Sequence, residues 1–176
     1  YFRMLEEGFD VTVAAPKKKP LRTVVHMPFG LDGTWDTFQE LPGFIIVPDA
    51  SLDEIDPSAF AALIIPGGRG PEHLRVDNRC LDIVRHFLQT DKPMAFICHS
   101  PQILTEALVS LGIKGKRLTA IHHSVKADVI AAGCIWVQTR EAVVDGNIVT
   151  AARRPDYDVW MRAFVTLLKE RGVKPA

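Results

Sequence analysis

Short, continuously apolar runs alternate with segments of helical period along this chain, and that alternation restricts its possible folds more than any other feature. Ala61–Ile65 and Met94–Ile97 are apolar throughout, which is typical of parallel strands buried on both faces. Cys80–Gln89 and Ile103–Leu111 place apolar residues three and four positions apart, as helices packed on a sheet do. The sequence therefore predicts an α/β domain on a mostly parallel sheet, with these two strands at its centre.

Other segments extend this pattern. Val11–Ala15 is predicted as the first strand, Ile135–Val137 as a further strand, and Asp156–Arg171 as the closing helix. Between Arg22 and Pro48 the pattern loosens into Gly, Pro and short β-branched pieces, which we interpret as a hairpin-like excursion. Asp145-Gly146-Asn147 separates two strand-like runs and predicts a second hairpin.

The length and charge of the chain limit its partners. Its 176 residues fit one domain, which we place over residues 1–176. Lys plus Arg equals Asp plus Glu at 21 each, so no overall field draws the protein to nucleic acid or to an anionic membrane. No apolar run approaches the roughly 20 residues of a membrane span, and no secretion signal opens the sequence. We expect a cytoplasmic protein with a small, weakly charged substrate.

The first residues have the character of the second half of a helix. Tyr1–Gly8 is amphipathic and ends on Gly8 as a C-cap, but no N-cap precedes it. A doubly wound domain normally opens with a strand that leads into its first helix. We therefore expect the first strand and the helix start to be absent from this sequence, the alternative being a short natural N-terminus.

One segment combines an apolar strand, a cysteine and an immediate helix start. Met94–Ile97 leads into Cys98, and the next helix carries Pro101 in its first turn, where proline costs no backbone hydrogen bond. Cys98 is thereby predicted at a strand-to-helix elbow that exposes its side chain, where N–H groups and the helix dipole stabilise a thiolate. We expect its pKa to fall from about 8.5 to about 6, which makes the thiol nucleophilic at neutral pH.

The remaining cysteines and histidines give no comparable signal. Cys80 and Cys134 lie in apolar surroundings and are expected to be buried and inert. Three widely spaced cysteines indicate neither a disulfide scaffold nor a zinc knuckle nor a redox pair. His122 and His123 are adjacent and so point differently, and Asp128 is the one carboxylate nearby. We expect no metal site and no cofactor.

A glycine turn follows another buried strand. The residues Ile64–Glu72, IIPGGRGPE, pass from strand to turn to a helix start, and ligands bind at such strand ends in open parallel sheets. A backbone N–H group of this turn near Cys98 can hold a developing oxyanion. The spacing matches neither the Walker pattern nor G-x-G-x-x-G, so a phosphate loop is disfavoured. Glu72 lies in a first helical turn, where the dipole favours a carboxylate with or without a catalytic task.

Together, IIPGGRGPE and AFICHSPQIL resemble the PfpI-type superfamily, which includes intracellular peptidase-like proteins, glutathione-independent glyoxalases and the Parkinsonism-associated deglycase, and which is similar to class-I glutamine amidotransferases. The likeness covers nearly the whole chain, including VTVAAP and VVDGNIVTAARRPDYDVWMRAFVTLL. It implies a flavodoxin-like, doubly wound α/β sandwich with a nucleophile elbow.

The resemblance also implies roles for individual residues. Cys98 is the nucleophile, His99 completes the C-H pair of the family, and the backbone N–H groups of Gly68 and His99 form the oxyanion hole. Glu72 matches a glutamate that peptidase-like members supply from a neighbouring subunit, which implies a homodimer or a higher homo-oligomer. His122 falls near the position where members carry a Tyr or a His in the substrate pocket, facing the nucleophile.

Two features depart from the family pattern. The glutamate that members carry on the loop after their first strand has no counterpart in this sequence. Ser100 stands where the usual motif has glycine after the C-H pair. Its hydroxyl is expected either to crowd the elbow or to add a hydrogen bond.

Three functions are compatible with these residues. In the leading hypothesis, Cys98 adds to a small reactive carbonyl and a carboxylate moves protons through the hemithioacetal, as in a glyoxalase or a deglycase. In the second, Cys98, His99 and Glu72 hydrolyse an amide or a short peptide through a thioester. In the third, the protein is a redox sensor or a holdase that responds through oxidation of Cys98.

Overall fold

The computed structural model of the chain describes residues 1–28 and 38–175, without the side chains of residues 27, 28, 38, 39, 122 and 123. Its residues form two compact units, a larger one of Tyr1–Val11 with Asp56–Ala176 and a smaller one of Thr12–Ile55. The expectation of a single domain stays a prediction.

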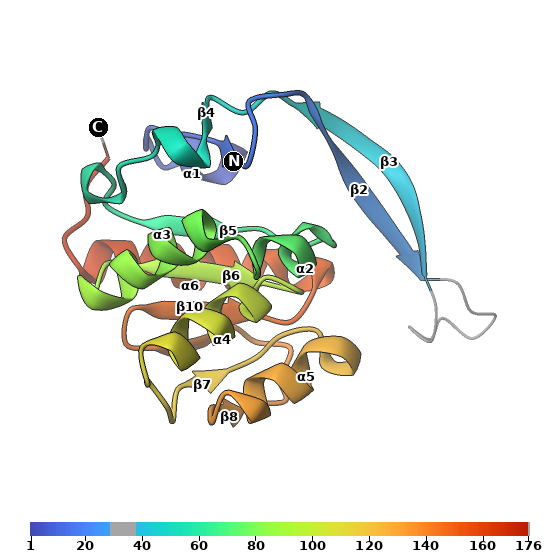
Figure 1. Cartoon of the computed structure of the whole chain (residues 1–176), viewed down its shortest axis with the longest axis vertical. Helices are drawn as coiled ribbons and strands as arrows, with labels where there is room; N and C mark the ends of the chain where they lie inside the picture. Colours follow the sequence, from blue (N-terminus) through green and yellow to red (C-terminus); the bar gives the residue numbers. More distant parts are fainter. Residues whose placement is uncertain (29–37, 176) are drawn as a thin grey trace. The chain divides into compact units, whose positions relative to one another are not determined.

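The main sheet of the larger unit has the strand order β5 (Leu63–Ile65), β6 (Met94–Ile97), β10 (Ile148–Ala151) and β9 (Val143–Asp145) (Figure 1). β6 pairs parallel with both β5 and β10, whereas β9 pairs antiparallel with β10. Every residue of β6 and β10 is buried, which explains their continuously apolar or small character. β6 therefore lies inside the sheet as predicted, while β5 forms an edge of the four strands described.

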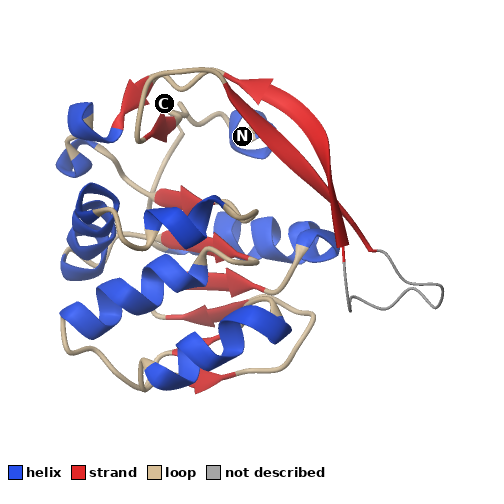
Figure 2. Cartoon of the chain, turned by 45° about the vertical axis from the view of Figure 1, so that its right-hand side comes forward, coloured by secondary structure: helices blue, strands red, loops and turns tan. Residues whose placement is uncertain are grey.

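Helices cover both faces of this sheet. Figures 1 and 2 show α3 (Asn78–Gln89) and α4 (Pro101–Ser110) on one side of β5, β6 and β10, and α6 (Tyr157–Glu170) on the other. α3 begins after Asp77, whose carboxylate accepts the backbone N–H of Arg79. The hydrophobic core therefore lies on both faces of the sheet. Its largest fully buried side chains include Phe87, Phe96, Phe164, Ile103 and Leu168.

Shorter elements complete the larger unit. They are α1 (Phe2–Glu6), η2 (Pro57–Ala59), α2 (Gly70–Leu74), β7 (Arg117–Leu118), α5 (His122–Ala131), β8 (Ile135–Trp136) and η3 (Arg154–Asp156). β7 and β8 pair parallel in a separate two-stranded sheet, so the strand predicted near Ile135 lies outside the main sheet. Gly8 follows α1 with φ 82°, the left-handed conformation expected of a C-cap glycine.

The smaller unit contains two strand pairs and a short helical turn. β1 (Ala14–Ala15) pairs parallel with β4 (Ala50–Ser51), and η1 (Leu52–Glu54) follows. β2 (Leu21–Pro28) pairs antiparallel with β3 (Phe38–Ile46), which confirms the hairpin predicted between Arg22 and Pro48. The connection between these two strands lies outside the described residues.

The predicted C-terminal hairpin is present, and its second strand has a further role. β9 and β10 pair antiparallel around Gly146, which has φ 64°. β10 also pairs parallel with β6, with Ala151 opposite Ile97, a contact between segments far apart in sequence. This pairing brings the carboxyl end of β10 beside the end of β6. Within the described parts of the chain, no helix has the length and apolar character to cross a membrane.

Candidate active site

Cys98 occupies the sharp turn between β6 and α4. Its φ of 63° lies in the left-handed region, which is uncommon for a residue with a side chain. Hydrogen bonds hold both backbone polar groups of this residue: its N–H donates to the carbonyl of Ala151 at 3.1 Å, and its carbonyl accepts the N–H of Ile121 at 3.1 Å. The predicted elbow is therefore present, and neighbouring segments hold its strained backbone in place.

Gly67 lies directly against the elbow. A Cβ on this residue would stand 2.6 Å from the Cβ of Cys98 and 3.1 Å from the carbonyl oxygen of Ile97. Only glycine fits so close an approach. The sequence indicates a ligand-facing glycine turn here, but it does not reveal that the first glycine is needed to make room for the cysteine.

The thiol of Cys98 is more enclosed than the sequence indicates, since the residue is only 8% exposed. Burial raises the pKa of this thiol above its usual value, while hydrogen bonds from the backbone N–H groups of Gly68 and His99 act in the opposite direction. The expectation of an exposed thiol with a pKa of about 6 is therefore wrong for this chain, because loss of solvent outweighs the two N–H donors. Those two donors are the groups expected to form the oxyanion hole.

The imidazole of His99 is fixed at both nitrogens. Nδ1 lies 2.9 Å from the carbonyl oxygen of Gly68, and Nε2 lies 3.0 Å from Oγ of Ser124. Because a carbonyl oxygen only accepts, Nδ1 carries the proton, and in the neutral ring Nε2 accepts the hydroxyl hydrogen of Ser124. Nδ1 is 3.9 Å from Sγ of Cys98, so this nitrogen faces the sulfur as a donor. The ring is thus oriented to stabilise a thiolate rather than to remove the thiol proton.

Ser124 is a site residue that the sequence does not single out. It lies in the first turn of α5, and only the docking of that helix brings it to His99. His122 begins the same helix, but its side chain lies outside the described residues, so its pocket role stays a prediction. Asp128, considered as a partner of the histidine pair, instead accepts hydrogen bonds from Gln102 at 3.1 Å and Arg75 at 3.1 Å.

Ser100 adds hydrogen bonds to the elbow and does not crowd it. Its fully buried hydroxyl accepts the backbone N–H of Ile97 at 2.7 Å. The same oxygen lies 2.8 Å from the carbonyl of Ile65 and 2.9 Å from that of Ile97, either of which can take its single hydrogen. Through Ile65, this serine links the end of β5, which leads into the glycine turn, to the residue before Cys98.

Glu72 lies on α2 and is held by Arg69. The guanidinium donates from Nε to the two carboxylate oxygens at 3.0 and 3.1 Å, and from Nη2 at 2.9 Å. These charge-assisted bonds, with smaller contributions from His99 and His73, lower the pKa of Glu72, which stays ionised near neutral pH. A catalytic role for this carboxylate in a neighbouring subunit stays a prediction.

The thiol of Cys98 influences the pKa of Tyr157, although the sequence gives no sign of this coupling. Tyr157 begins α6, shortly after the end of β10. Burial raises the pKa of its phenol; the thiol of Cys98 raises it further, while the guanidinium of Arg154 lowers it.

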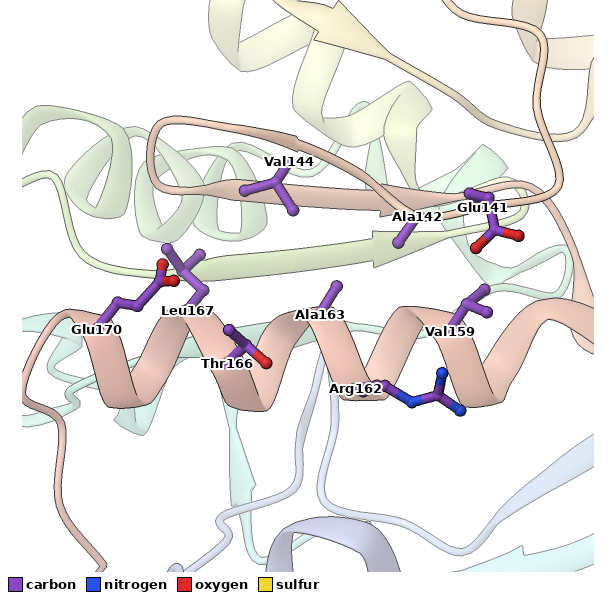
Figure 3. Close-up of a pocket in the computed structure, with 9 residues that line it drawn as sticks. All are labelled: Glu141, Ala142, Val144, Val159, Arg162, Ala163, Thr166, Leu167 and Glu170. Carbon is purple, nitrogen blue, oxygen red and sulfur yellow. The ribbon is translucent and has the colours of Figure 1, made fainter.

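Other features of the described residues do not extend the site. No group of three or more His, Cys, Asp or Glu in those parts of the chain is arranged to hold a metal ion. A groove of about 430 Å³ runs between β9 and α6 (Figure 3). Its lining contains none of the residues around Cys98; it consists of Glu141, Ala142, Val144, Val159, Arg162, Ala163, Thr166, Leu167 and Glu170.

Comparison with known proteins finds matches over nearly the whole chain. The sequence model of the DJ-1/PfpI family matches residues 1–167. A Pyrococcus furiosus protein named Deglycase PfpI is 38% identical over 96% of this chain and 89% of its own length. Deglycase TK1284 of Thermococcus kodakarensis is 42% identical over 95% of this chain and 87% of its own length.

A solved structure agrees with the fold. The ThiJ/PfpI domain protein from Brachyspira murdochii superposes with a TM-score of 0.74 at 21% identity, over 96% of this chain and 85% of that one. The predicted flavodoxin-like α/β fold with a mostly parallel sheet is therefore confirmed.

Proposed function

This chain belongs to the DJ-1/PfpI family, and we propose that it is a cysteine-dependent deglycase or glyoxalase that acts on small reactive carbonyls. Relatives named deglycases, at 38% and 42% identity over nearly the whole chain, support the activity. The observation that carries the mechanism is the elbow, where the thiol of Cys98 meets the backbone N–H groups of Gly68 and His99. We further propose that the protein works in the cytoplasm.

In the proposed reaction, the Cys98 thiol gives its proton to water, and the resulting thiolate forms a bond to the aldehyde carbon of an α-oxoaldehyde while the carbonyl electron pair moves to oxygen. The N–H groups of Gly68 and His99 hold the resulting oxyanion until it takes a proton. A proton then moves from the former aldehyde carbon to the neighbouring carbonyl, which leaves a thioester. Water cleaves this thioester to a 2-hydroxy acid and regenerates the thiol. A glycated amine enters the same route once its adduct has opened to the free amine and the carbonyl.

His99 assists this reaction by position and charge. Its Nδ1–H lies between the carbonyl of Gly68 at 2.9 Å and the sulfur of Cys98 at 3.9 Å, so it favours the thiolate as a donor. The hydroxyl of Ser124, 3.0 Å from Nε2, keeps the ring in this tautomer. The low pKa of the Arg69-bound Glu72 suits a fixed negative charge better than a strong base.

Peptide hydrolysis is the second candidate, and it requires a different arrangement. A Cys-His-Glu set uses the imidazole as the base for the thiol, whereas both nitrogens of His99 here bond to Gly68 and Ser124. Glu72 would have to leave Arg69 and come from a partner molecule, which makes a homo-oligomer part of this alternative. A redox sensor would depend on the same Cys98 thiolate, which burial and the raised pKa disfavour equally in every candidate, so the relatives named deglycases are what favour the first.

Product analysis separates these candidates. The protein is incubated with methylglyoxal in the absence of glutathione, and separately with a fluorogenic peptide, and lactate and peptide cleavage are measured. The proposal predicts lactate at a rate that rises with enzyme concentration. Peptide cleavage without lactate would replace it with the peptidase function. Sulfenic acid at Cys98 under mild peroxide, without turnover of either substrate, would instead favour the sensor.

A further inference from the structure

The enclosed site around Cys98 needs a route for protons. Cys98 is 8% exposed and His99 is 3% exposed, so bulk water has little direct access to either side chain. In the proposed reaction, the oxyanion of the adduct takes up a proton after the thiol has released one. A histidine can shuttle such a proton if its ring is connected to the surface by groups that both donate and accept hydrogen bonds.

Ser124 connects the imidazole of His99 to the surface. Nε2 of His99 lies 3.0 Å from Oγ of Ser124, and Ser124 is an exposed residue. On the other side of the ring, Nδ1 lies 2.9 Å from the carbonyl oxygen of Gly68 and 3.9 Å from Sγ of Cys98. A carbonyl oxygen only accepts hydrogen bonds, whereas a hydroxyl both accepts and donates. Of the two oxygens that hold the ring, only that of Ser124 can therefore pass a proton on to solvent.

The start of α5 fixes the backbone on both sides of Ser124. Ile121 is the N-cap of this helix, and its N–H donates to the carbonyl of Cys98 at 3.1 Å. Val125, which follows Ser124, is fully buried. The elbow and the core therefore anchor the segment that carries the hydroxyl, so packing, and not a loose surface turn, sets its position beside His99.

We propose that His99 and Ser124 form a proton relay between solvent and the adduct on Cys98. When Nδ1 gives its proton to the oxyanion, Nε2 takes the hydroxyl hydrogen of Ser124, and Oγ regains a hydrogen from a solvent water. The adduct gains one proton and solvent loses one, which balances the proton that the thiol gave to water. In thioester hydrolysis the direction reverses: Nδ1 takes a proton from the attacking water, and Nε2 returns one to solvent through Ser124, which restores the first tautomer.

Two substitutions of Ser124 test the relay without any turnover. Ser124→Thr and Ser124→Val add side chains of nearly the same shape, but only the first keeps a hydroxyl. NMR of 15N-histidine-labelled protein gives the rate at which the Nδ1–H of His99 exchanges with water, and the absence of this signal in His99→Asn assigns it. We expect Ser124→Val to slow the exchange roughly tenfold or more, because the proton then leaves only when the structure opens locally. Ser124→Thr should keep most of the wild-type rate.

Ala127→Val is the control for a branched side chain in the same helix. Ala127 is exposed and lies almost one turn beyond Ser124 in α5. This substitution adds the same kind of side chain without removing a hydroxyl, so it should leave the exchange rate unchanged. Equal exchange rates in Ser124→Val and Ser124→Thr, or an equal fall in Ala127→Val, would overturn the inference.

The part of the relay in turnover rests on the proposed function, whereas proton exchange between His99 and solvent does not. With methylglyoxal, kcat should fall roughly ten- to a hundredfold in Ser124→Val, with a larger solvent deuterium isotope effect, and recover in Ser124→Thr. If methylglyoxal is not converted but the exchange slows only in Ser124→Val, the proposed function fails and the relay stands. If it is converted with an equal kcat in all variants, the function stands and the relay has no part in the reaction.

Discussion

Gly67→Ala tests how tightly the glycine turn and the elbow fit together. The added Cβ would lie 2.6 Å from the Cβ of Cys98 and 3.1 Å from the carbonyl oxygen of Ile97. Neither atom is the end of a flexible side chain, so the turn itself must move. Overpacking of this kind costs about 1 to 3 kcal/mol of stability. The displacement also moves the N–H of Gly68 from the sulfur, which removes one of the groups that lower the thiol pKa.

Gly70→Ala is the matched control in the same turn. No atom lies within 4 Å of the Cβ that it adds, and Gly70 is the first residue of α2, where alanine is a good helix former. This variant should be neutral or stabilised by about 0.4 to 1 kcal/mol, because the unfolded chain loses freedom.

Two measurements follow each variant. Urea unfolding gives the stability change from the shift in midpoint at constant slope, and iodoacetamide labelling at neutral pH gives the reactivity of Cys98. We expect Gly67→Ala to unfold at lower urea and to label Cys98 more slowly, and Gly70→Ala to do neither. Equal stability and equal labelling rates for the two variants would refute the close approach of Gly67 to the nucleophile.

Three further predictions concern single side chains. Ser100→Ala should lose about 1 to 3 kcal/mol in urea unfolding, since it leaves the buried N–H of Ile97 without its serine partner, whereas Ser110→Ala at the exposed end of α4 should lose less. Burial raises the pKa of the Cys80 thiol from its usual 9.0 to about 11. Between these two pH values the unfolded chain loses the thiol proton while the folded chain keeps it, so the free energy of unfolding should fall by about 2 to 3 kcal/mol as the pH rises from 9 to 11. Cys80→Ala should abolish this fall. If Glu72 acts across an interface, inactive Cys98→Ala and Glu72→Ala chains should regain partial activity when mixed and reassembled, and full activity of Glu72→Ala alone would exclude that role.

Local patterns in the sequence were sufficient to predict the positions of most helices and strands of the larger unit. Met94–Ile97 is β6 in the structure, and the helices predicted from Cys80, Ile103 and Asp156 are α3, α4 and α6 within two residues at their starts. Apolar periodicity carries this information, because each element buries one stripe or both faces. The pairing of β10 with β6 is different, since register between distant segments depends on tertiary packing.

The candidate site also combines features that the sequence predicts with features that it does not. The elbow at Cys98 follows from the adjacent strand and helix start, and the structure places it there. The burial of Cys98, which raises the pKa of its thiol, depends on the segments that cover the turn, and no local sequence motif predicts these. Ser124 reaches His99 only because α5 docks beside the elbow, so its own surroundings in the sequence give no signal.

The most direct test of the account is the steady-state conversion of methylglyoxal to lactate by wild type, Cys98→Ala and Cys80→Ala. The two substitutions remove the same atoms from two buried cysteines, of which only Cys98 lies at the elbow. The account predicts that Cys98→Ala loses on the order of a thousandfold or more in kcat/KM, as removal of a nucleophile does, while Cys80→Ala retains most of it. Lactate formation by Cys98→Ala at a rate close to that of wild type would contradict the central claim that Cys98 is the nucleophile.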